Sequence, residues 1–277
     1  MSTSVSKSVW EGRIPLAFSI DGSEAQHFGA EHTPSSIFIE VPRTSYLILL
    51  TEEIRDLYRA TGLTLPDSTA EIWFEYQGKP LKWHYPLGLL YDILCISEPS
   101  YLQMEDTKSI PWNIKVHFRN YPAAHLFRDQ SAATAQDFFM SMIKEADFLR
   151  YGSTKRVMNL SKSDQTQLWE SLCSNDFDSF WKVNQRLIPV DDQVVRHIPL
   201  RLYLPDDCPV IQDRVSPRTE DGEELTMEQI IRELLPTLDT SKSKAVCHGV
   251  IVPFDTPIIW ASRNLAYPDN FLHIALF

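Results

Sequence analysis

Residues 13–20 read RIPLAFSI, with an apolar side chain at every second position from Ile14 onward. A period of two predicts a β-strand that buries one face. Residues 197–204 read HIPLRLYL and alternate in the same way, again around an Ile-Pro-Leu tripeptide. Two strands of this kind, far apart in one chain, suggest that a structural unit occurs twice.

The residues that follow the first strand predict a small mixed α/β unit up to about Arg119. The predicted strands cover 36–41, 71–76 and 112–118, with a turn at Gln77-Gly78 after the 71–76 strand. A helix over 45–60 carries apolar residues at helical spacing. Thr44 is its expected cap and Gly62 its expected end. A short helix is predicted over 86–94.

The residues that follow the second strand predict the same order of elements. Strands are expected over 210–215, 245–252 and 272–276, and a short turn or helix over 260–265. The main helix covers 227–235, where Thr226 and Gln229 match the capping-box pattern. Both units therefore have the order β-β-α-β-(short helix)-β, in which one amphipathic helix covers one face of a mixed sheet. This is the order of the β-grasp, or ubiquitin-like, fold.

The segment between the two units contains one glycine, Gly152, and has helical periodicity throughout. Three helices are predicted, over 131–151, 166–173 and 176–187, with turns at Gly152 and near Ser174-Asn175. The first has an expected apolar stripe of Phe138, Met142, Ala146 and Leu149. The predicted loops cover 21–35, 97–110 and 236–243.

The predicted fold class is therefore α+β, with two ubiquitin-like domains flanking a helix-rich domain. The expected boundaries are an N-terminal helix or segment over 1–12, a first ubiquitin-like domain over 13–120, a helix-rich domain over 121–190 and a second ubiquitin-like domain over 191–277.

The formal net charge of the chain is −11. An acidic chain repels the phosphate backbone, so nucleic acid is not an expected partner. One stretch, residues 148–162, has basic residues and no acid, namely Arg150, Lys155, Arg156 and Lys162. Such a stretch is commonly a solvated helix face, and the alternative is a peripheral membrane contact.

The sequence offers little for catalysis. It contains no Cys-X-X-Cys pair, no nucleotide-binding glycine motif and no HExxH motif, so no metal and no cofactor are expected. It also shows no apolar leader or membrane-spanning run. One enzymatic alternative stays open: a cysteine hydrolase that uses Cys173 or Cys247 with a distant histidine. The chain ends at Leu276-Phe277, without the glycine tail of a ubiquitin-like modifier, so we expect it to receive a modifier rather than to be one.

Several stretches resemble the autophagy-related protein 5 family, in the family's order and over nearly the whole chain. They are 9–15 (VWEGRIP), 42–47 (PRTSYL), 71–76 (EIWFEY), 78–90 (GKPLKWHYPLGLL), 111–118 (PWNIKVHF), 142–147 (MIKEAD), 176–184 (DFDSFWKVN) and 267–274 (YPDNFLHI). The aromatic block of 71–90 is the most specific of these. Residues 21–35, 97–110 and 205–244 match poorly, so no function is carried over to them.

The resemblance implies two ubiquitin-like domains around a helical one, which agrees with the pattern above. It also implies that the lysine of Lys-Glu-Ala-Asp, here Lys144, is the isopeptide acceptor for the ubiquitin-like autophagy-related protein 12. The conjugate would bind the N-terminal helix of the coiled-coil autophagy-related protein 16. It would then act in an E3-like manner on the E2-like enzymes of autophagy, which attach a second modifier to phosphatidylethanolamine. The implied location is the cytoplasm and the pre-autophagosomal structure.

The chain itself is then expected to be a non-catalytic scaffold. A packed trio of domains leaves a groove that can hold a helix, and Trp10, Trp83 and Trp260 are its candidate residues because aromatic side chains are enriched at interfaces. The main alternative function is a non-covalent binding module with two ubiquitin-like domains that is never conjugated.

Overall fold

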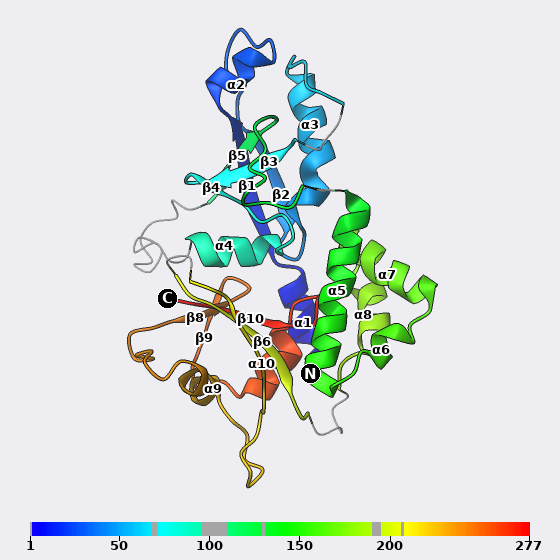
Figure 1. Cartoon of the computed structure of the whole chain (residues 1–277), viewed down its shortest axis with the longest axis vertical. Coiled ribbons are helices and arrows are strands. Elements are labelled where there is room, and N and C mark those ends of the chain that lie inside the picture. Colours follow the sequence, from blue (N-terminus) through cyan, green and yellow to red (C-terminus); the bar gives the residue numbers. More distant parts are fainter. Residues whose placement is uncertain (1, 68–70, 96–109, 129–130, 190–194, 206–207) are drawn as a thin grey trace.

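The computed structural model describes residues 2–67, 71–95, 110–128, 131–189, 195–205 and 208–277. It confirms the predicted fold class: along the chain, a first five-stranded sheet is followed by a set of helices and then by a second five-stranded sheet (Figure 1). The predicted loop over 97–110 falls almost entirely outside the described residues.

The first sheet has the strand order β2-β1-β5-β3-β4. Its strands are β1 (Arg13–Ile20), β2 (Ile37–Pro42), β3 (Trp73–Tyr76), β4 (Lys79–Pro80) and β5 (Trp112–His117). The two central strands, β1 and β5, are parallel, whereas every other pair is antiparallel. Two helices accompany the sheet, α3 (Thr51–Ala60) and α4 (Leu87–Cys95).

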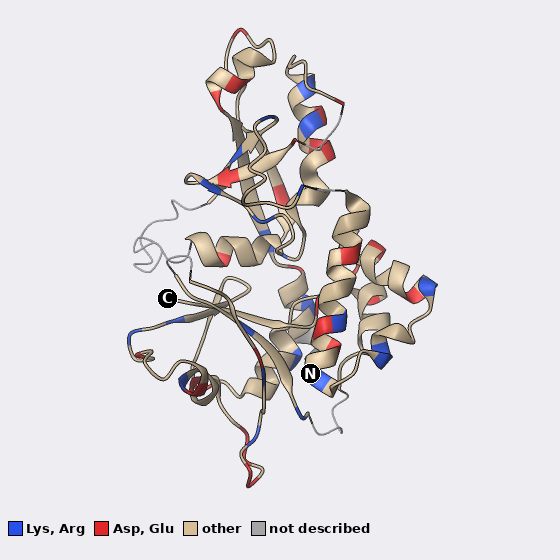
Figure 2. Ribbon diagram, in the orientation of Figure 1, with Lys and Arg blue, Asp and Glu red and all other residues tan. Residues whose placement is uncertain are grey.

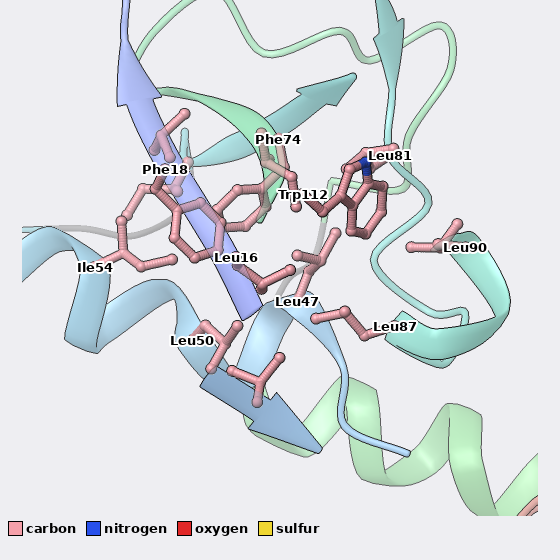
Figure 3. Close-up of a cluster of buried hydrophobic side chains, with 14 of the residues drawn as sticks. Leu16, Phe18, Leu47, Leu50, Ile54, Phe74, Leu81, Leu87, Leu90 and Trp112 are labelled. Atoms are coloured by element: carbon pink, nitrogen blue, oxygen red, sulfur yellow. The ribbon is translucent and has the colours of Figure 1, made fainter. Parts of the chain in front are cut away.

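The core of this domain forms where α3 and α4 close over one face of the sheet (Figure 3). Leu16, Phe18 and Trp112 project from the strands, and Leu47, Ile54 and Leu87 meet them from the helical side. Each of these side chains is almost completely buried. Burying one large apolar side chain contributes roughly 1.5–3 kcal/mol, so this cluster is the main source of stability in the domain.

Two predictions for this domain are wrong. Thr44 does not cap the helix: the buried run Leu47–Leu50 forms a 3-10 turn, and α3 begins only at Thr51 without a side-chain cap. The predicted loop over 21–35 contains the short helix α2 (Gly22–His27). Asp21 caps this helix, because its side chain accepts a hydrogen bond from the Ser23 backbone N–H. In the first case the buried residues of the 3-10 turn set the start of the helix, and in the second the Asp21 cap did. Helical periodicity does not reveal either boundary.

The second sheet repeats the topology of the first, with the order β7-β6-β10-β8-β9. Its elements are β6 (Ile198–Tyr203), β7 (Ile211–Val215), α9 (Met227–Leu234), β8 (Ala245–Cys247), β9 (Val250–Val252), α10 (Ile258–Leu265) and β10 (Leu272–Leu276). The predicted capping box of α9 is confirmed by reciprocal bonds between Thr226 and Gln229. The predicted single strand over 245–252 is wrong, because His248 and Gly249 turn the chain into a hairpin between β8 and β9.

The helical part consists of α5 (Ala132–Tyr151), α6 (Lys155–Met158), α7 (Lys162–Cys173) and α8 (Phe177–Asn184), and the N-terminal helix α1 (Ser2–Trp10) packs on α10. The predicted turns at Gly152 and Asn175 are confirmed by their left-handed backbones. α7 begins four residues earlier than predicted because Ser161 and Asp164 form a capping box. Among the described residues, no helix is long and apolar enough to cross a membrane.

Candidate functional site

Lys144 lies near the middle of α5, the longest helix described. Ser131 caps the start of this helix by accepting a bond from the Thr134 N–H, and Gly152 ends it at a φ of 70°. The predicted apolar stripe of α5 is right at Ala146 and is off by about one residue at its other positions. Ala135, Phe139, Ile143 and Ala146 are buried, whereas Phe138, Met142 and Leu149 are half-buried. Lys144 itself is half-buried.

The residue next to Lys144 ties α5 to the second sheet. The Glu145 carboxylate accepts a bond from Arg201 at 3.2 Å and another from Gln212 at 2.7 Å. Arg201 also donates to the sulfur of Met142 and lies over the Phe271 ring. These contacts join one turn of α5 to β6 and β7 at the position of the lysine. In the described part of the chain, Lys144 itself forms no ion pair, so its amine is not committed to a carboxylate.

A groove opens where α1, α8 and α10 meet. Its walls combine aromatic and polar side chains from all three parts of the chain, including Trp10, Phe177, Trp181, Ile259 and Arg263. The ring of Trp10 lies 4.8 Å from that of Phe180, and its indole N–H donates to the Asn175 carbonyl at 3.3 Å.

The three tryptophans singled out from the sequence have three different environments. Trp10 is buried and lines the groove. Trp83 is buried elsewhere, packs on Phe138 and donates to the Phe127 carbonyl. Trp260 lies on α10 and is 45 % exposed, but it is not among the lining residues. Only Trp10 therefore remains a groove candidate.

Buried polar contacts hold the walls of the groove together, and the sequence did not reveal them. The side-chain amides of Asn184 in α8 and Asn270, which precedes β10, donate hydrogen bonds to each other's carbonyl oxygens at 3.1 and 2.9 Å. Arg150 at the end of α5 donates to the Asn270 carbonyl at 3.1 Å. Since each of these groups is buried, losing one partner would leave another unsatisfied.

This placement corrects the expectation for the basic stretch. Arg150 is 4 % exposed, and burial lowers its pKa to about 10, so it stays charged but faces the protein. Lys155, Arg156 and Lys162 are exposed. These three are the residues of the stretch that can contact an extended surface such as a membrane.

The two candidate nucleophiles have unsuitable surroundings for a cysteine hydrolase. Cys173 is exposed, but partial desolvation, with a smaller contribution from Glu170, raises the pKa of its thiol to about 11. Burial also raises the pKa of Cys247 well above its usual value, and its thiol points at the Leu265 carbonyl. A nucleophilic cysteine requires a thiolate at neutral pH, so the raised pKa values of both thiols disfavour this alternative. Among the described residues, no cluster of His, Cys, Asp and Glu is suited to hold a metal ion.

Three family models match the chain in succession. "Autophagy protein ATG5, UblA domain" matches residues 9–118, "Autophagy protein ATG5, alpha-helical bundle region" matches 132–190, and "Autophagy protein ATG5, UblB domain" matches 197–276. The two ubiquitin-like matches coincide with the two sheets, and the bundle match coincides with α5 to α8.

Curated relatives and a solved structure agree with these matches. "Autophagy protein 5" of Phaeosphaeria nodorum is 33 % identical over 298 residues, covering 97 % of this chain and 94 % of the relative. "Autophagy protein 5" of Drosophila melanogaster is also 33 % identical, covering 98 % and 96 %. The crystal structure of Kluyveromyces marxianus Atg5 superposes with a TM-score of 0.80 at 24 % identity, covering 99 % of both chains. At that identity the superposition supports the fold alone.

Proposed function

This chain belongs to the autophagy protein 5 family, and we propose on that basis that it is an autophagy scaffold joined covalently, through Lys144, to the ubiquitin-like autophagy-related protein 12. The single observation that supports this acceptor best is its position. Lys144 lies on a long capped helix. The residue next to it, Glu145, is hydrogen-bonded to two strands of the second sheet.

The reaction asks little chemistry of this chain. The Lys144 amine attacks the carbonyl carbon of a thioester on an E2-like enzyme, an isopeptide C–N bond forms, the C–S bond breaks, and the amine gives up a proton as the thiol leaves. Lysine amines are mostly protonated at neutral pH, so the enzyme supplies the activation. The scaffold holds the amine in a fixed position, and positioning of the reactants accounts for a large part of the rate enhancement of such reactions.

The acceptor can be tested on denaturing gels of cells that carry the autophagy conjugation machinery. Wild type is expected to show a second band, heavier by one ubiquitin-like modifier, which is absent from Lys144→Arg. Lys155→Arg, which changes an exposed lysine on the neighbouring α6, is the matched control and keeps the band. A heavier band at normal yield in Lys144→Arg would contradict the proposal.

We also propose that the groove between α1, α8 and α10 binds the N-terminal helix of the coiled-coil autophagy-related protein 16. Grooves lined by aromatic side chains suit amphipathic helices, and Trp181, which lines this one, stacks on Phe177. Trp181→Ala is expected to weaken capture of that helix at least tenfold, because a few aromatic side chains carry most of the binding energy of an interface. Phe148→Ala removes an exposed ring that does not line the groove and leaves capture unchanged.

The remaining steps follow from the family. The assembled conjugate is proposed to act in an E3-like manner with the E2-like enzymes, so that a second modifier is attached to phosphatidylethanolamine during autophagosome formation. Its proposed location is the cytoplasm and the pre-autophagosomal structure, with peripheral membrane contact through the exposed Lys155, Arg156 and Lys162. The non-covalent binding module remains the competing function, and the gel experiment separates the two.

A further inference from the structure

A second cleft, which shares Arg150 and Pro189 with the groove, lies between the end of α5, α6 and the second sheet. It is lined by Arg150, Tyr151, Gly152, Arg156, Pro189, Arg196, His197 and Arg214. Its volume is about 500 Å³, within the range of roughly 300–1,000 Å³ that is common for small-molecule sites. It joins two domains, because Arg156 belongs to α6, Arg196 and His197 lead into β6, and Arg214 lies on β7.

The charge of this cleft is its most unusual property. Four arginines and a histidine line it, and none of its lining residues within the described ranges is acidic, in a chain whose net charge is −11. Arg156, Arg196 and Arg214 are exposed, and none of them has an ion pair within the described ranges. Figure 2 shows the basic segments on the carboxyl-terminal part of α5 and on α6. The buried Asp147 carboxylate offsets part of the charge of Arg150 and Arg156. The remaining guanidinium groups still repel one another, and an anion between them relieves that repulsion.

Parts of the cleft are already fixed in place. The Arg156 guanidinium lies 4.1 Å from the centre of the Tyr151 ring, and the Tyr151 hydroxyl donates to the Leu187 carbonyl. The buried Arg150 is anchored on the Asn270 carbonyl. The carboxyl end of α5 opposes an anion, but its effect is equivalent to only about half a negative charge, which the four arginines outweigh.

His197 provides a further polar group. Its Nδ1 atom is buried and has no hydrogen-bond partner among the described residues. Burial, followed by the charges of Arg214 and Arg196, holds the pKa of His197 below its usual value. The side chain therefore lies in a positive potential, which an anion in the cleft would reduce.

We propose that this cleft binds a compact ligand with several phosphate groups, either a soluble polyphosphate or the phosphorylated headgroup of a lipid. Arginine is the side chain best suited to grip phosphate oxygens in pairs. Because several guanidinium groups surround one cavity, a ligand with several phosphate groups fits it better than a ligand with a single phosphate. The ligand would bridge α6 and the second sheet, so it would also tie the helical domain to the second ubiquitin-like domain. The proposal does not depend on Lys144.

Titration calorimetry on the full unconjugated chain, with myo-inositol hexakisphosphate at about 0.15 M salt, tests the proposal. Wild type is expected to bind one equivalent, and the triple variant Arg156→Gln/Arg196→Gln/Arg214→Gln to bind at least tenfold more weakly. The matched control is Arg13→Gln/Arg128→Gln/Arg186→Gln, which removes the same charge from exposed positions outside the cleft and leaves the affinity unchanged. A single reversal, Arg214→Glu, gives a second variant should the triple one fold poorly.

Vesicle flotation distinguishes the two sources of phosphate. Phosphatidylcholine vesicles with phosphatidylinositol bisphosphate are compared with vesicles brought to equal charge by phosphatidylserine. Preference for the bisphosphate, lost in the triple variant, assigns the cleft to a lipid headgroup, whereas binding of the soluble probe alone assigns it to a soluble polyphosphate. Equal weakening in the control variant, or no saturable binding of the soluble probe to wild type, would overturn the proposal.

Discussion

The two ubiquitin-like domains share one strand order but differ in what covers the outer face of the sheet. In β5 of the first domain the residues alternate, with Trp112, Ile114 and Val116 buried and Asn113 and Lys115 exposed. In β10 of the second domain all five residues are buried. The cause is visible in Figure 1: α4 of the first domain and α5 of the helical part pack against the second sheet. The same fold therefore serves once as a peripheral domain and once as the centre of the assembly.

A reciprocal exchange at equivalent positions tests this difference most strongly. Lys115 pairs with Ser19 of β1 where Ala275 pairs with Tyr203 of β6. Ala275 is 1 % exposed, so Ala275→Lys buries an unpaired charge and is expected to lower the free energy of unfolding by more than about 3 kcal/mol. Lys115→Ala is expected to change it by less than about 0.5 kcal/mol, because the Lys115 side chain is exposed and its Nζ lies 4.0 Å from the Glu75 carboxylate, which makes a weak ion pair. Urea unfolding of both variants is the measurement, and equal effects would contradict the comparison.

The two hairpins offer a second test with a smaller effect. Gly78 and Gly249 occupy equivalent turns with φ of 81° and 77°. A Cβ at Gly78 meets nothing within 4 Å, whereas one at Gly249 lies 2.8 Å from the Arg43 guanidinium. That group is paired with the buried Asp92 and bonded to the Gly88 carbonyl, so it has little room to move.

Gly78→Ala is expected to cost about 1–2 kcal/mol from backbone strain alone. Gly249→Ala is expected to cost about 1–2 kcal/mol more, because it adds a clash at the junction of the two ubiquitin-like domains. Thermal unfolding followed by circular dichroism compares the two, and equal melting temperatures would show that Arg43 adapts freely.

The buried His248 of the second hairpin is expected to make the free energy of unfolding depend on pH in the acidic range. Burial, with the charge of Arg43 second, lowers the pKa of His248 to about 3. Since an unfolded histidine titrates near ~6.5, the unfolded state binds more protons below that pH. The free energy of unfolding is therefore expected to fall as the pH drops from about 6.5 towards 3, by at most about 1.4 kcal/mol per unit.

His248→Asn is expected to flatten this slope, although it lowers stability at pH 7 by removing the stack on Tyr267. His27→Asn, at an exposed position of α2, is expected to leave the slope unchanged. Denaturant unfolding at a series of pH values measures both slopes, and an unchanged slope in His248→Asn would contradict the prediction.

The sequence predicted the repeated fold because its evidence is local: period-two strands, a capping box at Thr226 and the Gln77-Gly78 turn. It missed the second hairpin because the apolar residues on both sides of His248-Gly249 resemble one strand, although that pair occupies the place of Gln77-Gly78 in the repeat and carries the same turn signal. It placed the α5 stripe one residue away because that helix packs on neighbours along several faces, so burial follows the assembly rather than a single stripe. The contacts between distant elements, such as Glu145 with Arg201 and Gln212, have no local signature at all.

The acceptor itself is the central claim, and it came from a family motif rather than from periodicity. Peptide mass spectrometry of the purified conjugate tests it directly, because the branched peptide identifies the modified lysine. We expect the modifier's C-terminal glycine on the Nζ of Lys144. The same glycine on another lysine, such as Lys155 or Lys162, with Lys144 unmodified, would contradict the account.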